Sequence, residues 1–63
     1  MRPMSEFNPD QPARLHDRLA GHFVEWRSGW AHDWRQYARA NKVDGTVAWD
    51  GMILDGWEPL GSS

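Results

Sequence analysis

The sequence predicts an α+β fold, in which one long amphipathic helix is followed by a β-hairpin. Seven large apolar side chains recur every three or four residues, the spacing that places them on one face of a helix. This apolar stripe consists of Leu15, Leu19, Phe23, Trp26, Trp30, Trp34 and Tyr37. After the stripe the apolar period changes to two, around an Asp-Gly pair at positions 50–51.

The helix is expected to span about residues 10–41. Asp10 is a suitable N-cap, and Asn41 lies just before a Gly-containing segment that can end a helix. The pair Ser28-Gly29 offers a possible break, because glycine is unfavourable inside a helix. The stripe keeps its phase across this pair, which favours one continuous helix. Two shorter helices, broken near Ser28-Gly29, are the alternative.

The β-hairpin is expected over about residues 46–55. The pair Asp50-Gly51 readily adopts the positive φ angles of a type I′ turn, and this turn fixes the register of the two strands. The second strand is expected to end at the next Asp-Gly pair, 55–56. On one face the register pairs Trp49 with Met52 and Val47 with Leu54. These four side chains are predicted to cover one end of the helix.

These elements divide the 63 residues into three parts. Residues 1–9 contain two prolines and isolated apolar residues, which predicts a flexible N-terminal arm. Residues 10–60 form a single small helix-plus-hairpin domain. Residues 61–63, Gly-Ser-Ser, are expected to be a loose tail.

Composition indicates a globular protein rather than a disordered one. The chain is 40% hydrophobic, 25% charged and contains five tryptophans, whereas disordered chains are poor in aromatic residues. It has no cysteine, which excludes disulfides and thiolate chemistry. Neither the apolar core of a signal peptide nor a run of roughly 18 apolar residues is present, so we expect a soluble, cytoplasmic protein.

Catalytic, metal and cofactor sites are not expected. His16, His22 and His32 are six and ten residues apart, so on one helix they point in different directions and cannot converge on a metal. The three Asp-Gly pairs lack the ligand spacing of a calcium loop and are interpreted as turns. A fold of one helix and one hairpin hardly forms the enclosed pocket that catalysis requires.

The length of the stripe predicts a protein partner. A helix of about 30 residues is about 45 Å long, whereas a short hairpin spans about 14 Å, so much of the stripe would stay uncovered in a monomer. We therefore expect a non-enzymatic interaction module that forms a homo-oligomer or joins a larger complex as an accessory subunit. The predicted contact residues are Leu19, Phe23, Trp26, Trp30, Trp34 and Tyr37.

Asp33 and Val24 lie outside the stripe but differ from the typical polar-face residues of the expected helix. Asp33 lies at the margin of the stripe, where its carboxylate could pair with an arginine across an interface or be an ordinary edge residue. Val24 is the one clear apolar residue on the opposite, polar face of the expected helix.

Nucleic-acid binding is the alternative function. Five basic residues lie broadly along one side of the expected helix, and two Trp-Arg pairs occur within it, so indoles could stack on bases while the basic side chains contact phosphates. These candidate contacts are Arg14, Arg18, Arg35, Arg39 and Lys42. The net charge of −2 and the use of the tryptophans for a core both weigh against this function.

Overall fold

The structure, a computed structural model, describes residues 1–61 and consists mainly of β-strands. The strands are β1 (Ala13–Asp17), β2 (His22–Trp26), β3 (Arg39–Ala40), β4 (Val47–Trp49) and β5 (Met52–Pro59). The helical elements are the 3-10 helices η1 (Met4–Glu6) and η2 (Ser28–Trp30) and the α-helix α1 (Ala31–Tyr37). Of the tail expected at 61–63, residues 62 and 63 lie outside the described part of the chain.

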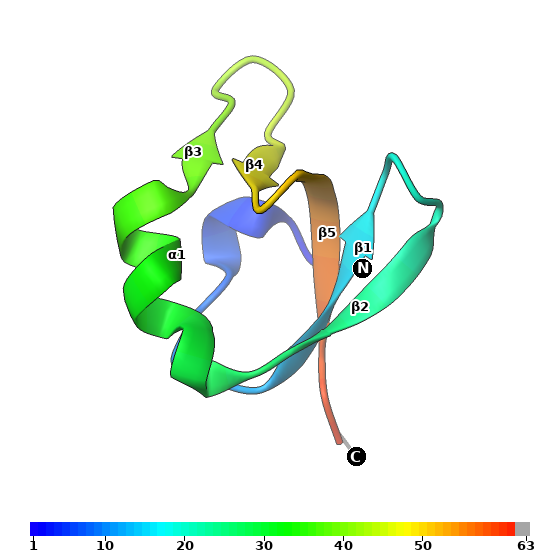
Figure 1. The fold of residues 1–63 in the computed structure, drawn as a ribbon. Helices are drawn as coiled ribbons and strands as arrows, with labels where there is room; N and C mark the ends of the chain where they lie inside the picture. The colour runs from blue at the N-terminus through cyan, green and yellow to red at the C-terminus, as the bar shows by residue number, and fades with distance from the viewer. Residues whose placement is uncertain (62–63) are drawn as a thin grey trace.

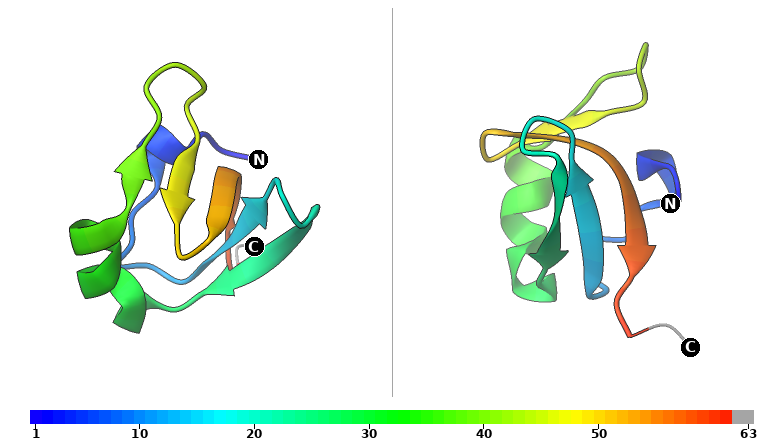
Figure 2. Two further views of the ribbon diagram at one scale, coloured as in Figure 1. Left: turned by 45° about the horizontal axis from the view of Figure 1, so that its top comes forward. Right: turned by 90° about the vertical axis from the view of Figure 1, so that its right-hand side faces the viewer.

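The described strands form one antiparallel sheet in the order β2-β1-β5-β4-β3. The chain leaves the edge strand β2, passes through η2 and α1, and enters the opposite edge strand β3, so α1 joins the two edges of the sheet (Figure 1). The sheet is strongly curved, and β5 bends along its length (Figure 2). This curvature leaves a concave side that faces α1.

The predicted long helix is wrong, and with it the α+β class: this is a mainly β fold. The segment 10–41 forms β1, β2, η2, α1 and β3, and within it only residues 31–37 are α-helical. Breaking the helix near Ser28-Gly29 does not repair the prediction, because the half before the break is a β-hairpin. The predicted helix-plus-hairpin organisation of residues 10–60 is replaced by this sheet.

A second periodicity explains why β1 is a strand. Along β1 the side chains alternate between the concave interior and the outer face, with Ala13, Leu15 and Asp17 buried. The outward residue His16 faces Phe23 of β2, and the two ring centroids are 5.2 Å apart. Leu15 therefore fits a period of two as well as the helical stripe, because side chains alternate across a strand.

The turn between β1 and β2 is organised by Asp17 and Gly21. Gly21 has a φ of 76°, a conformation that favours glycine, and its N–H donates to the carbonyl of Asp17 at 2.8 Å. The buried Asp17 carboxylate accepts the backbone N–H of Leu19 at 3.0 Å and that of Ile53 at 3.4 Å. One carboxylate thus links the β1–β2 turn to β5.

The C-terminal hairpin is confirmed in turn and register. Trp49 pairs with Met52 and Val47 with Leu54, as predicted. The two turn residues, Asp50 and Gly51, have φ angles of 51° and 77°, both in the left-handed region that a type I′ turn requires. The second strand does not end at 55–56, however. β5 continues to Pro59 because its second half pairs with β1.

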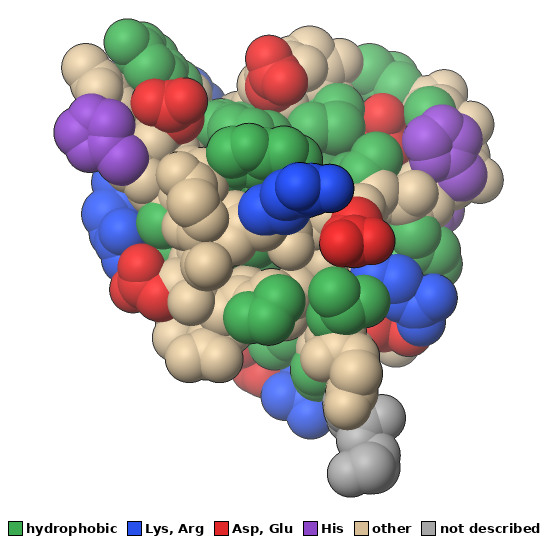
Figure 3. Space-filling view, turned by 60° about the horizontal axis from the view of Figure 1, so that its bottom comes forward, with side chains coloured by type: hydrophobic (Ala, Val, Ile, Leu, Met, Phe, Trp, Pro, Cys, Tyr) green, Lys and Arg blue, Asp and Glu red, His purple; other side chains and the backbone are tan. Residues whose placement is uncertain are grey.

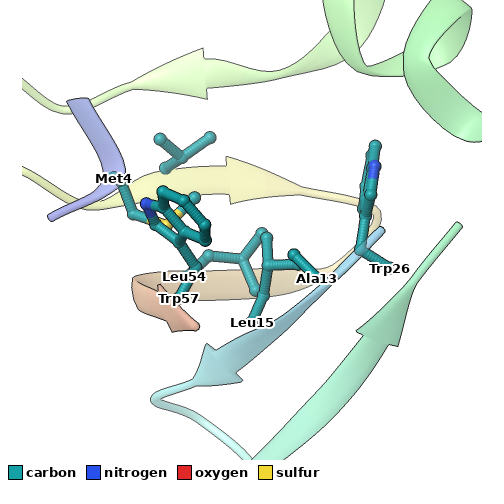
Figure 4. Packing of buried hydrophobic residues seen from close by; sticks show 7 residues of the cluster. Met4, Ala13, Leu15, Trp26, Leu54 and Trp57 are labelled. Carbon is teal, nitrogen blue, oxygen red and sulfur yellow. The ribbon is translucent and has the colours of Figure 1, made fainter. Parts of the chain in front are cut away.

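The core lies on the concave side and consists of side chains from the sheet and from the N-terminal segment. Leu15 and Leu54 are fully buried, and Trp26 is 2% exposed. Met4 and Trp57 lie beside Leu54, whereas Trp26 projects separately towards α1 (Figure 4).

Residues 1–9, expected to be a flexible arm, lie against the sheet. The backbone of Arg2 forms a pair of hydrogen bonds with Trp57, of 2.8 and 3.0 Å. The indole N–H of Trp57 donates to the carbonyl of Pro3, and that of Trp26 donates to the carbonyl of Pro9, both at 2.9 Å. These bonds give both buried tryptophans a partner for their one polar atom.

Among residues 1–61, no helix has the length and apolar character needed to cross a membrane.

Candidate functional site

A groove opens between the η2–α1 segment and the concave side of the sheet. Its volume is about 620 Å³, and most of its lining is apolar. The lining residues are Leu15, Val24, Glu25, Trp26, Trp30, Asp33, Tyr37, Trp49, Asp50, Met52 and Leu54. They come from β1, β2, η2, α1 and the β4–β5 hairpin, so segments far apart in the sequence meet to form the groove.

Three indole rings meet in the groove. The buried ring of Trp26 lies 5.5 Å from that of Trp30 and 5.0 Å from that of Trp49, measured between ring centroids, with edge-to-face geometry in both pairs. The centroids of Trp30 and Trp49 are 6.1 Å apart, and the planes are tilted by 36°. Trp26 therefore supports two more accessible indoles, whose orientations are fixed by packing against it.

The short helix α1 divides its side chains between core and groove. Ala31 is buried, and Trp34 packs against the core. Trp30, Asp33 and Tyr37, spaced three and four residues apart, line the groove instead. Trp30 is 40% exposed and Tyr37 is 59% exposed. These two aromatic side chains are thus available to a ligand.

Two carboxylates in the groove lining have no ion-pair partner among the described residues. Of the nine acidic side chains, four lie within ion-pair distance of a basic side chain, and Asp17 accepts backbone N–H groups. Of the remaining four, Asp33 and Asp50 line the groove, and Glu6 lies on η1. Glu25 belongs to β2, where the alternation of side chains places its carboxylate on the outer face, opposite Arg14. Within the described part of the chain, the groove lining includes no Lys, Arg or His.

The structure separates the residues that were predicted to form one contact stripe. Trp26, Trp30 and Tyr37 come together in the groove. Leu19, 71% exposed, lies on the β1–β2 turn, and Phe23 lies on the outer face of β2. Trp34 packs between α1 and the core, so its centroid lies 5.2 Å from that of Trp26. The premise of a continuous apolar ridge too long for the hairpin to cover is therefore wrong.

The four predicted hairpin side chains divide between two roles. Val47 and Leu54 are buried in the core, while the partly buried Trp49 and Met52 line the groove. The hairpin side chains therefore pack within the curved sheet and beside η2 and α1, and not against the end of a long helix.

The sequence prediction missed Val24, Glu25 and Asp50 as groove residues. Val24 was the one available signal: its apolar side chain was out of place on the polar face of a helix. On β2 it pairs with Leu15 and faces the concave side.

The five basic residues proposed for nucleic-acid contact do not share one helical side. Arg14 pairs with Glu58 at 3.0 Å, and Arg35 pairs with Asp10 at 2.6 Å. Arg18 lies 3.6 Å from Asp44. Arg39 and Lys42 lie on β3 and in the loop that follows it, where Arg39 donates to the backbone carbonyls of Gln36 and Ala38. Ion pairing and dispersal both reduce the electrostatic attraction that these residues offer to a phosphate backbone.

The histidines also occupy separate places. Nδ1 of His16 lies 2.6 Å from an oxygen of Asp55 on the outer face of the sheet, while His22 and His32 are exposed elsewhere. Among the residues described, no group of three or more His, Cys, Asp or Glu side chains is placed to hold a metal ion.

The molecular surface combines apolar and charged groups. On the face drawn in Figure 3, hydrophobic side chains lie intermixed with charged side chains of both signs.

Comparisons with protein-family models, with curated proteins and with solved structures find no match.

Proposed function

We propose that this protein is a non-enzymatic interaction module whose groove binds a short segment of a partner protein. The observation that supports the proposal is the accessible pair Trp30 and Trp49, which is held in place by the buried Trp26. Large aromatic side chains in a concave site are typical of the residues that dominate binding energy at protein interfaces.

The size of the groove supports a peptide segment as the occupant. Its volume of about 620 Å³ lies within the range of about 300–1,000 Å³ typical of ligand pockets. This space accommodates a few side chains but not a folded domain. The rigid floor formed by Leu15, Leu54 and Trp26 also reduces the entropy lost on binding.

The groove offers a binding surface without any uncovered helix. Self-association was expected because a long ridge needed cover, and the structure does not contain that ridge. A second copy of this chain is therefore one possible source of the bound segment, alongside a different protein. Light scattering over a concentration series, with Trp30→Ala as the comparison, distinguishes the two sources.

Selection from a random peptide display library tests the proposal directly. We expect peptides that bind the wild-type protein and lose binding to Trp30→Ala. The matched control is Leu60→Ala, because Leu60 is exposed to a similar extent and lies outside the groove lining. This variant should retain binding. Failure of every selected peptide to distinguish wild type from Trp30→Ala would overturn the proposal.

Nuclear magnetic resonance then maps the binding site. The five tryptophans give five indole N–H signals. A bound peptide should shift the signals of Trp30 and Trp49, while Trp57, whose indole is bonded to Pro3, provides the internal reference. Larger shifts for Trp57 than for Trp30 would place the binding site elsewhere.

Nucleic-acid binding remains the alternative proposal. It is tested by titration with single-stranded and duplex DNA at low ionic strength, where phosphate contacts are strongest. Salt-dependent binding that is weakened by Arg39→Ala and Lys42→Ala would support it. Absence of binding under these conditions would remove it.

A further inference from the structure

We infer that the groove recognises an arginine side chain in the segment that it binds. This inference rests on the proposed function and specifies the chemistry of the partner. The features that point to arginine are two carboxylates and accessible aromatic rings lining the same apolar groove, namely Asp33 and Asp50 with Trp30, Tyr37 and Trp49.

The charge of the groove favours a cationic ligand. Most acidic side chains outside the groove are already paired with basic ones or with backbone N–H groups. Asp33 and Asp50 are exposed and form no ion pair among residues 1–61, so the groove has an uncompensated negative charge. A cationic ligand gains from this field both in association rate and in bound-state contacts.

The aromatic rings of the groove also favour a cationic ligand. A cation over the face of an indole or phenol ring is attracted by the ring quadrupole, and the attraction increases when the site is partly desolvated. Trp30 and Tyr37 flank Asp33 on one face of the η2–α1 segment. A cation bound there would contact an aromatic face and a carboxylate at the same time.

Arginine fits both features better than lysine. The guanidinium group is planar, so it can stack on an indole face and still donate in its own plane to a carboxylate. It is also more weakly hydrated than an ammonium group, which lowers the cost of entering a largely apolar groove. The apolar floor accommodates the methylene groups of the same side chain.

Two peptides that differ only in charge test the inference. The probes are acetyl-Ala-Leu-Arg-Leu-Ala-amide and its counterpart in which citrulline replaces arginine. Citrulline has nearly the same shape but is neutral. We expect the arginine peptide to bind wild-type protein about tenfold more tightly, as measured by the indole shifts of Trp30 and Trp49.

Protein variants identify the carboxylates responsible. In the double variant Asp33→Asn and Asp50→Asn, the preference for arginine over citrulline should fall to about twofold or less. Asparagine tolerates the left-handed conformation of Asp50, so the turn is retained. Glu6→Gln is the matched control, because it removes one unpaired carboxylate outside the groove. This control should keep the full preference.

The possible outcomes separate this inference from the proposed function. Equal affinity for the two peptides, with binding still dependent on Trp30, would overturn arginine recognition and leave a groove for neutral segments. Absence of binding by both peptides, while library-selected neutral peptides bind, would have the same meaning. Absence of any Trp30-dependent peptide would overturn the proposed function itself. An arginine preference unchanged in the double variant would contradict the role of the carboxylates.

Discussion

The indole N–H of Trp26 donates a 2.9 Å hydrogen bond to the carbonyl oxygen of Pro9. This bond satisfies the only polar atom of a side chain that is otherwise enclosed by Phe7, Trp34 and Trp49. It also ties the N-terminal segment to the end of β2. Trp26 is thus a structural residue beneath the groove, and its neighbours Trp30 and Trp49 are the indoles that a ligand can reach.

Trp26→Ala is expected to unfold the protein. Replacing a buried tryptophan by alanine costs about 3–5 kcal/mol, which is comparable to the whole stability of a small domain. Trp26→Phe keeps much of the ring but removes the donor to Pro9, so an intermediate loss is expected. Urea unfolding followed by circular dichroism measures both variants. An unchanged midpoint for Trp26→Ala would contradict the buried position of this ring.

Trp30→Ala should have a smaller effect on stability and a larger one on binding. Because the side chain is 40% exposed, we expect a loss of about 1–2 kcal/mol in the free energy of unfolding. Peptide binding in the groove should be abolished in the same variant. A loss as large as that of Trp26→Ala would instead assign Trp30 to the core.

Asp17→Ala should destabilise the link between the β1–β2 turn and β5. The substitution leaves the N–H groups of Leu19 and Ile53 without their acceptor, at a cost of about 1–3 kcal/mol. Asp17→Asn retains an acceptor oxygen and should be milder. Amide hydrogen exchange should become faster at Leu19 and Ile53 first. Unchanged exchange at both residues would contradict the role of this carboxylate.

Gly51→Ala should destabilise the β4–β5 hairpin, because position 51 has a φ of 77°. Placing an L-residue with a side chain in this region costs roughly 1–2 kcal/mol. Gly29→Ala is the matched control, since Gly29 has no positive φ and space for a Cβ atom. It should be neutral or slightly stabilising. Thermal unfolding compares the pair, and equal midpoints would count against the turn assignment.

The C-terminal hairpin could be predicted because its determinants are local. The pair Asp50-Gly51 selects the turn, and the turn fixes which residues face each other, so the register follows without reference to the rest of the chain. The extension of β5 beyond Gly56 depends on pairing with β1, which lies far away in the sequence. No local pattern indicates that contact.

The long helix failed because the two periodicities overlap in residues 13–26. Leu15, Phe23 and Trp26 satisfy helical spacing, but Ala13, Leu15 and Asp17 also alternate as a strand requires. Gly21 separates two such segments, and the second, His22–Trp26, contains valine and two aromatic residues. Weight given to this glycine and to the misplaced Val24 would have favoured a hairpin.

The groove could be predicted only in part, because its lining depends on tertiary contacts. Of the predicted contact residues, Trp26, Trp30 and Tyr37 line the groove, and their role in binding stays a prediction. Asp50 approaches the rings of η2 and α1 only because the sheet curves and α1 joins its two edges. Such convergence is a property of the tertiary fold and has no signature in sequence spacing.

The central position of β1 between β2 and β5 determines when this protein can fold during its synthesis. β1 is made early, yet one of its two neighbours ends only at Pro59. The nascent chain therefore cannot complete its interior until that residue has left the ribosomal exit tunnel. Before β5 pairs with β1, Leu15 lacks part of the cover that buries it, so native structure forms once this whole segment is available rather than progressively along it.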